Sequence, residues 1–166
     1  MTAAEVEARA IALVREAFAA ARAGDAEGLE RLLACGVPPD VRNEKGDSLL
    51  MLASYHGHAE ATARLLAHGA DTEQVNDRGQ VPLAGVGFQG EAGIAALLLD
   101  HGARIDATDP AGRTPLMFAA MFDRTETVDL LLARGADGRR VDAGGQTAAT
   151  LARAMGAEGA AKALAA

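Results

Sequence analysis

Cysteine and aromatic side chains are almost missing from this sequence. Its 166 residues include a single cysteine, Cys35, no tryptophan, and an aromatic content of only 3%. One cysteine excludes an internal disulfide framework and favours a reducing compartment, the cytoplasm. With so few aromatic residues, any hydrophobic core must be thin and built mainly from alanine and leucine.

Long apolar runs and clusters of basic residues are missing as well. No apolar run approaches the roughly 20 residues that cross a membrane. Glu5, Glu7 and Arg9 interrupt the N-terminus, which therefore lacks the pattern of a secretory signal. Acidic residues outnumber basic ones 23 to 16, for a net charge of −7. Because nucleic-acid-binding proteins carry a basic patch, we expect neither a nucleic-acid nor a membrane partner.

Glycine, in contrast, is abundant and recurs at a fixed interval of 33 residues. Three series hold 12 of the 19 glycines: Gly46, Gly79, Gly112 and Gly145; Gly36, Gly69, Gly102 and Gly135; and Gly24, Gly57, Gly90 and Gly156, with Asp123 at the vacant position of the last series. A constant period of this length indicates stacked repeats rather than one globular core. Stacked repeats present extended binding surfaces and seldom enclose a catalytic pocket.

The segment 43–75 illustrates one repeat. Gly46 predicts a tight turn, and Ser48, directly after it, has the side chain of a helix N-cap. Gly57 and Gly69 are placed to end two short helices in the left-handed conformation. Each repeat is therefore predicted to be a turn followed by two antiparallel helices that are too short to be stable without neighbours.

Several motifs recur in this register. Residues 112–116 read Gly-Arg-Thr-Pro-Leu and are followed by Ala119-Ala120, whereas Gly57-His58, Leu65-Leu66 and Gly69-Ala70-Asp71 complete the pattern in the second repeat. In this combination the unit resembles the ankyrin repeat. The resemblance implies an all-α solenoid of stacked helix-turn-helix units with hairpin-like turns. We expect one domain over residues 1–166, with a helical extension or cap at 1–13 and repeats at about 14–42, 43–75, 76–108, 109–141 and 142–166.

The third repeat departs from the pattern. Gly85 and Gly87 lie inside its first helix and Gly93 inside its second, and each interior glycine costs about 1 kcal/mol relative to alanine. We expect this repeat to be the least stable of the five, with the weakest protection against hydrogen exchange. Asp123, where a glycine is expected, is tolerable because aspartate enters the left-handed region more readily than most residues.

Residues 2–22 are predicted to form one helix longer than any in the repeats. Thr2 and Glu5 have the spacing of a capping box, and apolar residues recur at steps of three and four. One interpretation is that this helix covers the exposed apolar face of the first repeat, as the ends of such stacks require. The other is that it docks a second subunit or a partner.

Large side chains gather at the ends of the first helices. Tyr55, Phe88 and Met121 share one register, and His56, Gln89 and Phe122 share the next. The resemblance implies that this end lines a concave, protein-binding groove beside the turn tips. The turn tips would form its polar rim with Glu44, Lys45, Asp47, Asp77, Arg78, Gln80 and Arg113. The alternative is that the large side chains pack between neighbouring first helices as core.

Metal and catalytic sites find little support. Cys35, His68 and His101 share one register, but stacked helices lie roughly 8–10 Å apart and zinc ligands lie about 2.0–2.3 Å from the ion. The sequence also lacks Gly-x-Ser-x-Gly, phosphate-binding and His-Glu-x-x-His motifs. We therefore expect no metal, no cofactor and no enzymatic activity.

These observations predict a protein–protein interaction module. It would bind an unidentified partner protein through the groove and be a monomer without that partner. The alternative is a structural or self-associating protein that uses the long N-terminal helix. The high alanine content favours a bacterial origin.

Overall fold

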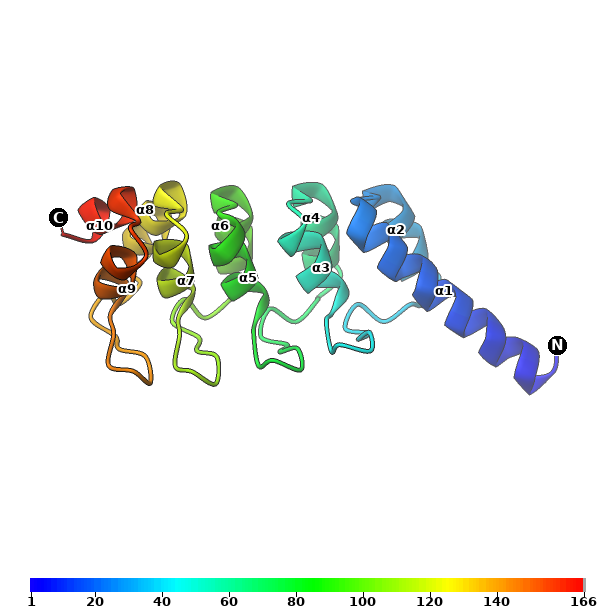
Figure 1. The fold of residues 1–166 in the computed structure, drawn as a ribbon. Coiled ribbons are helices and arrows are strands. Elements are labelled where there is room, and N and C mark those ends of the chain that lie inside the picture. The colour runs from blue at the N-terminus through cyan, green and yellow to red at the C-terminus, as the bar shows by residue number, and fades with distance from the viewer. Residues whose placement is uncertain (166) are drawn as a thin grey trace.

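The computed structural model describes residues 1–165, which form ten α-helices (Figure 1). In chain order they are α1 (Ala3–Ala23), α2 (Ala26–Ala34), α3 (Leu49–Tyr55), α4 (Ala59–Ala67), α5 (Pro82–Gln89), α6 (Ala92–Asp100), α7 (Pro115–Met121), α8 (Thr125–Ala133), α9 (Ala148–Ala154) and α10 (Glu158–Ala165). The described chain has no strand, and an isolated β-bridge joins Arg42 and Ser48 across a turn. The predicted all-α solenoid is confirmed. Ala166, which the expected fifth repeat includes, lies outside the described residues.

The helices form two layers along a row of five pairs. One layer consists of α1, α3, α5, α7 and α9, and the other of α2, α4, α6, α8 and α10. Each helix contacts its partner within the pair and the equivalent helix of the neighbouring repeat. The turns between pairs project together past the first layer, so their tips follow one edge of the stack (Figure 1). Within residues 1–165, no helix has both the length and the apolar character needed to cross a bilayer.

The core is a thin layer built mainly from alanine and leucine. Leu65, Leu98 and Leu131, at the repeat interval, are fully buried between the two layers. Burial of such a side chain contributes about 1.5–3 kcal/mol, and it requires a neighbouring repeat on each side. The repeats therefore stabilise one another, which is why helices of seven to nine residues persist here.

Local capping sets the helix starts. The hydroxyls of Ser48, Thr114 and Thr147 accept hydrogen bonds from the backbone amides three residues ahead, at 3.1, 3.3 and 3.2 Å. The N-cap of α5 is Val81, which has no side-chain hydrogen bond to offer. Because a side-chain cap contributes about 1 kcal/mol, the third repeat lacks a stabilising contact that its neighbours have. Its lower stability stays a prediction.

Asp123 has a structural role beyond replacing a glycine. It is the one non-glycine residue with positive φ in the described chain, at 55°. Its Oδ1 accepts a hydrogen bond from the Ala160 backbone amide at 2.7 Å, in the first turn of α10. Because the first amides of a helix have no partner within it, Asp123 caps the terminal helix from the preceding repeat.

Helix α1 contacts the repeats only through its C-terminal half. Its N-terminus has the predicted capping box, in which the Glu5 amide donates to Thr2 Oγ1 at 3.2 Å and the Thr2 amide to the Glu5 carboxylate at 2.6 Å. Residues 1–12 are all exposed, and this half of α1 runs out beyond the stack (Figure 1). The buried residues of the helix are Ala17, Phe18, Ala20 and Ala21. Residues 1–12 therefore project from the first repeat, whereas Leu13 and Val14 pack partly against the core and residues 17–21 supply most of the cover.

A polar cluster joins α2 to α4 in the layer formed by the second helices of the repeats. His68 Nε2 lies 2.9 Å from Glu30 Oε1, and Arg64 Nη1 lies 3.5 Å from Glu30 Oε2. The hydrogen bond from His68, aided by the charge of Arg64, lowers the pKa of the Glu30 carboxyl below its usual value. The three side chains are partly exposed, so the cluster orients the two helices more than it stabilises them.

Candidate partner-binding groove

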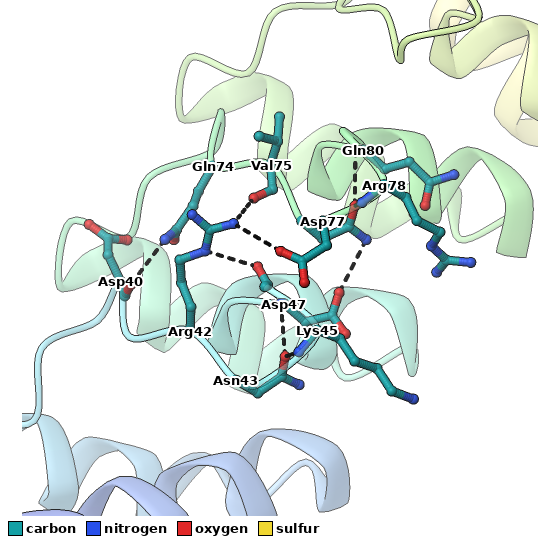
Figure 2. A network of polar contacts seen from close by, with 12 residues as sticks. Asp40, Arg42, Asn43, Lys45, Asp47, Gln74, Val75, Asp77, Arg78 and Gln80 are labelled. Atoms are coloured by element: carbon teal, nitrogen blue, oxygen red, sulfur yellow. Dashed lines mark hydrogen bonds and ion pairs between the residues drawn. The ribbon is translucent and has the colours of Figure 1, made fainter.

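The turn tips are linked across repeats by side-chain hydrogen bonds (Figure 2). Arg42 Nη2 donates to the Val75 carbonyl oxygen at 2.7 Å, and its Nε donates to the Gly46 carbonyl oxygen at 3.2 Å. Asn76 Nδ2 donates to Asp47 Oδ1 at 3.2 Å. Consecutive turns are therefore held in register, and the side chains outside these contacts project from an ordered edge.

Two arginines in neighbouring turns have donors left over. Figure 2 shows the Arg78 side chain extending away from the contacts between turns, and within residues 1–165 its guanidinium has no hydrogen bond or ion pair. Arg113 Nε lies 3.8 Å from Asp142 Oδ2 and is buried without a hydrogen-bond partner. Arginine presents five N–H donors, so both groups retain capacity to bind an anion.

Three aromatic rings form a row along the ends of the first helices. The Tyr55 and Phe88 rings are stacked, with centroids 6.2 Å apart and planes 10° apart. Phe88 and Phe122 meet edge to face at 4.4 Å. Tyr55 is 38% exposed, and the two phenylalanines are half-buried. The rings thus pack against one another between repeats, as core residues do, and they also remain partly accessible, as a groove lining requires.

The aromatic row and the turn tips border a hollow of about 390 Å³. This size falls within the roughly 300–1,000 Å³ of ligand sites. Eight of the ten predicted binding residues line it: Tyr55, His56, Phe88, Met121, Phe122, Asp47, Arg78 and Arg113. Gln89, half-buried at the end of α5, and Glu44, exposed in its turn, are not among the lining residues. The binding role of all ten stays a prediction.

The hollow exists because the third repeat has small residues where its neighbours have large ones. Gly85 occupies the position of Leu52 in the second repeat and of Phe118 in the fourth. Ala84 likewise occupies the position of Met51. All five residues line the hollow, and none of them is among the ten predicted binding residues. The signal was present in the sequence, because side-chain size compared across equivalent positions reveals the missing volume.

The charged groups around the hollow differ from those of the whole chain. Its lining includes two arginines, Arg78 and Arg113, and one carboxylate, Asp47. That carboxylate already accepts the hydrogen bond from Asn76. Asp142 pairs with Arg113, whereas within residues 1–165 Arg78 has no ion pair. Its unpaired guanidinium can attract an acidic ligand although the net charge of the chain is −7.

The residues considered for metal binding have other roles or lie alone. His68 contacts Glu30, and His101 Nδ1 lies 2.8 Å from the Leu97 carbonyl oxygen of its own helix. Cys35 is exposed and unpaired by a disulfide. Among residues 1–165, no three His, Cys, Asp or Glu side chains come together as metal ligands do.

Comparison with known proteins agrees with the architecture. A family model described as ankyrin repeats in three copies matches residues 17–109 and also residues 85–166. A curated protein of Pseudomonas aeruginosa, described as an ankyrin repeat protein, is 60% identical over 43 residues. That alignment covers 26% of this chain and 25% of the relative, so the similarity spans about a quarter of the relative's length.

Proposed function

This chain belongs to the ankyrin repeat family, and from that premise we propose that it binds a partner protein through the groove lined by Tyr55, Phe88 and Phe122. Ankyrin repeats are generally protein–protein interaction modules. The observation that carries the proposal is the row of accessible aromatic rings beside a hollow. Exposed apolar patches mark interaction sites, and aromatic anchors dominate the energy of protein interfaces.

The order of the scaffold supports this role. The contacts from Arg42 and Asn76 to neighbouring turns hold the rim in place, and the stacked rings hold one another. A partner that docks on such a surface orders few additional side chains. Association then loses less conformational entropy, which favours affinity.

The double variant Tyr55→Ala/Phe88→Ala tests the proposal directly. We expect the partner captured by the intact chain in a pull-down to be lost by this variant. Loss of a central aromatic anchor costs at least about 2 kcal/mol, or roughly 30-fold in affinity, and this variant removes two of them. Circular dichroism and thermal unfolding would establish that the stack still folds.

Val75→Ala/Val141→Ala is a matched control for the aromatic variant. Both valines are exposed, at 42% and 56%, and neither lines the groove. This variant removes surface apolar area elsewhere and should capture the same partner as the intact chain. An identical set of captured proteins for all three chains would move the binding site away from the groove.

Self-association through α1 is a second candidate. Val6 and Ile11 are 49% and 47% exposed on the projecting half of the helix. A depression of about 570 Å³ lies between α1 and α2 at the same end of the stack, with Ala23 and Leu32 in its lining. The projecting helix of one copy would fill the depression of another.

Sedimentation velocity separates the two candidates. The groove proposal expects a monomer at all accessible concentrations when no partner is present. Self-association expects a dimer that Val6→Asp dissociates and that Ala8→Asp, a similar change at another exposed position, leaves intact. A dimer with this behaviour would favour α1 over the groove as the functional surface.

We also keep cytoplasmic residence and bacterial origin as parts of the proposal. The first is supported by a single free cysteine, since secreted domains of this size commonly use disulfides. The second is supported by the bacterial relative.

A further inference from the structure

The groove combines unused positive charge with an apolar hollow. Arg78 has no charged or hydrogen-bonding partner for its guanidinium within residues 1–165. Arg113 Nε is buried with no hydrogen bond, and its nearest carboxylate oxygen is 3.8 Å away on Asp142. The protein already covers this Nε, but the Arg113 side chain as a whole is 37% exposed. Within residues 1–165 its two terminal nitrogens have no hydrogen bond, so they and the Arg78 guanidinium are the donors that a ligand can reach.

Apolar residues line the same hollow as these arginines. Gly85 leaves space between Leu52 and Phe118, and the Phe88 ring forms one wall. Leu52 and Phe118 are 9% and 8% exposed, so they offer an apolar floor and no hydrogen-bonding groups. A large apolar side chain would displace water from this floor and gain the free energy of burial.

We infer that the groove binds a segment of a partner protein in which a large apolar side chain lies beside an aspartate or glutamate. The apolar side chain enters the space left by Gly85, and the carboxylate pairs with Arg78 and Arg113. This inference rests on the proposed function and adds the chemistry of the partner to it. Arginine–carboxylate pairs are charge-assisted and commonly bidentate, so they give both affinity and orientation.

Other segments fit this surface less well. A basic segment would bring cations next to two arginines and to one carboxylate, Asp47, which already accepts a hydrogen bond from Asn76. A purely apolar segment would cover the exposed guanidinium donors of Arg78 and Arg113 without supplying an acceptor. Covering an unsatisfied donor opposes binding, whereas a carboxylate would remove this deficit.

A randomised peptide library displayed on phage and selected against the full chain tests the inference. A parallel selection against Tyr55→Ala/Phe88→Ala supplies the background. We expect the peptides enriched only by the intact chain to share a large apolar residue with Asp or Glu within a few positions. Synthetic copies should bind in fluorescence anisotropy and lose affinity when the acid is replaced by its amide or the ionic strength is raised.

The role of the arginines is tested with glutamine variants that remove their positive charge, and with a control that makes the same change outside the groove. Arg78→Gln/Arg113→Gln should lower the affinity for the acidic peptides by at least about tenfold and leave the affinity for their amide versions unchanged. Arg78→Gln alone keeps the test valid if loss of Arg113 disturbs the turn, because within residues 1–165 the Arg78 guanidinium has no hydrogen bond or ion pair to lose. Arg139→Gln, the same change at an exposed arginine outside the groove, should bind like the intact chain.

The outcomes distinguish the inference from the proposed function. Enriched peptides that require Tyr55 and Phe88 but show no preference for acids would overturn the inference and leave the groove proposal standing. Acidic peptides that bind Arg78→Gln/Arg113→Gln as tightly as the intact chain would do the same. If no peptide is enriched above the background selection, both the proposed function and the inference fail.

Discussion

Replacement of Gly85 by leucine is expected to weaken partner binding at least about tenfold while the repeat stack stays folded. Leucine already occupies the equivalent position in the second repeat, at Leu52. A leucine at 85 would fill the hollow from within and exclude the partner. The Gly85 Cβ would lie 3.3 Å from Tyr55 Cδ2, so the tyrosine ring must shift by a few tenths of an ångström. Affinity for the captured partner should fall at least about tenfold, by analogy with loss of a central interface contact.

Stability provides the internal check on this variant. Leucine is favoured over glycine inside a helix by about 0.8–1 kcal/mol, so the thermal midpoint of Gly85→Leu should not fall. Gly93→Leu is the matched control, because no atom lies within 4 Å of the Cβ position there and Gly93 is exposed. It should keep full affinity. Undiminished binding by Gly85→Leu would mean that the hollow is not the binding site.

The second large effect is expected at Gly87, where alanine should destabilise the fold. A Cβ at this position would lie 2.6 Å from the Pro115 carbonyl oxygen at the start of α7. Because that atom belongs to the backbone, the clash is relieved only if α5 and α7 move apart. Overpacking of this kind costs about 1–3 kcal/mol, which outweighs the gain of about 1 kcal/mol in helix propensity. Urea unfolding should show a lower midpoint.

Gly93→Ala is expected to have the opposite effect on the free energy of unfolding. The same change of composition in the same repeat meets open space, so only the helix propensity changes and the free energy of unfolding should rise by about 1 kcal/mol. Comparison of the two variants in one denaturant series separates packing from propensity. If Gly87→Ala were as stabilising as Gly93→Ala, then the close approach of α5 and α7 would not require glycine.

These three glycines mark the boundary of what sequence reasoning can predict. In the sequence they are equivalent, because each is an interior helical glycine with the same intrinsic cost. In the structure Gly85 leaves a hollow, Gly87 permits a close helix contact, and Gly93 faces open space. The intrinsic cost of glycine in a helix applies at all three positions. At Gly87 the close helix contact offsets this cost, whereas the missing cap at Val81 lowers the expected stability of the third repeat further.

The candidate site, too, can be predicted from the sequence only in part. The register of Tyr55, Phe88 and Phe122 was visible at the repeat interval, but whether the rings were core or surface depended on how closely adjacent repeats approach. Among the predicted rim residues, Asp47 contributes to the contacts between turns as well as to the lining, whereas Arg78 keeps a free guanidinium. Their sequence positions alone do not distinguish these two environments.

Four features can be predicted from the sequence: the repeat length, the starts and ends of the helices, the family, and the place of the large side chains within each unit. These features follow from interactions over a few residues, such as the Ser48 cap and the left-handed Gly57, and the period of 33 copies them along the chain. The packing of neighbouring repeats, in contrast, sets which small residues leave a hollow, which permit a close helix contact and which arginine donors stay unused in the described chain. Those properties depend on distances between atoms about 33 residues apart in sequence, and such distances arise only when neighbouring repeats pack together.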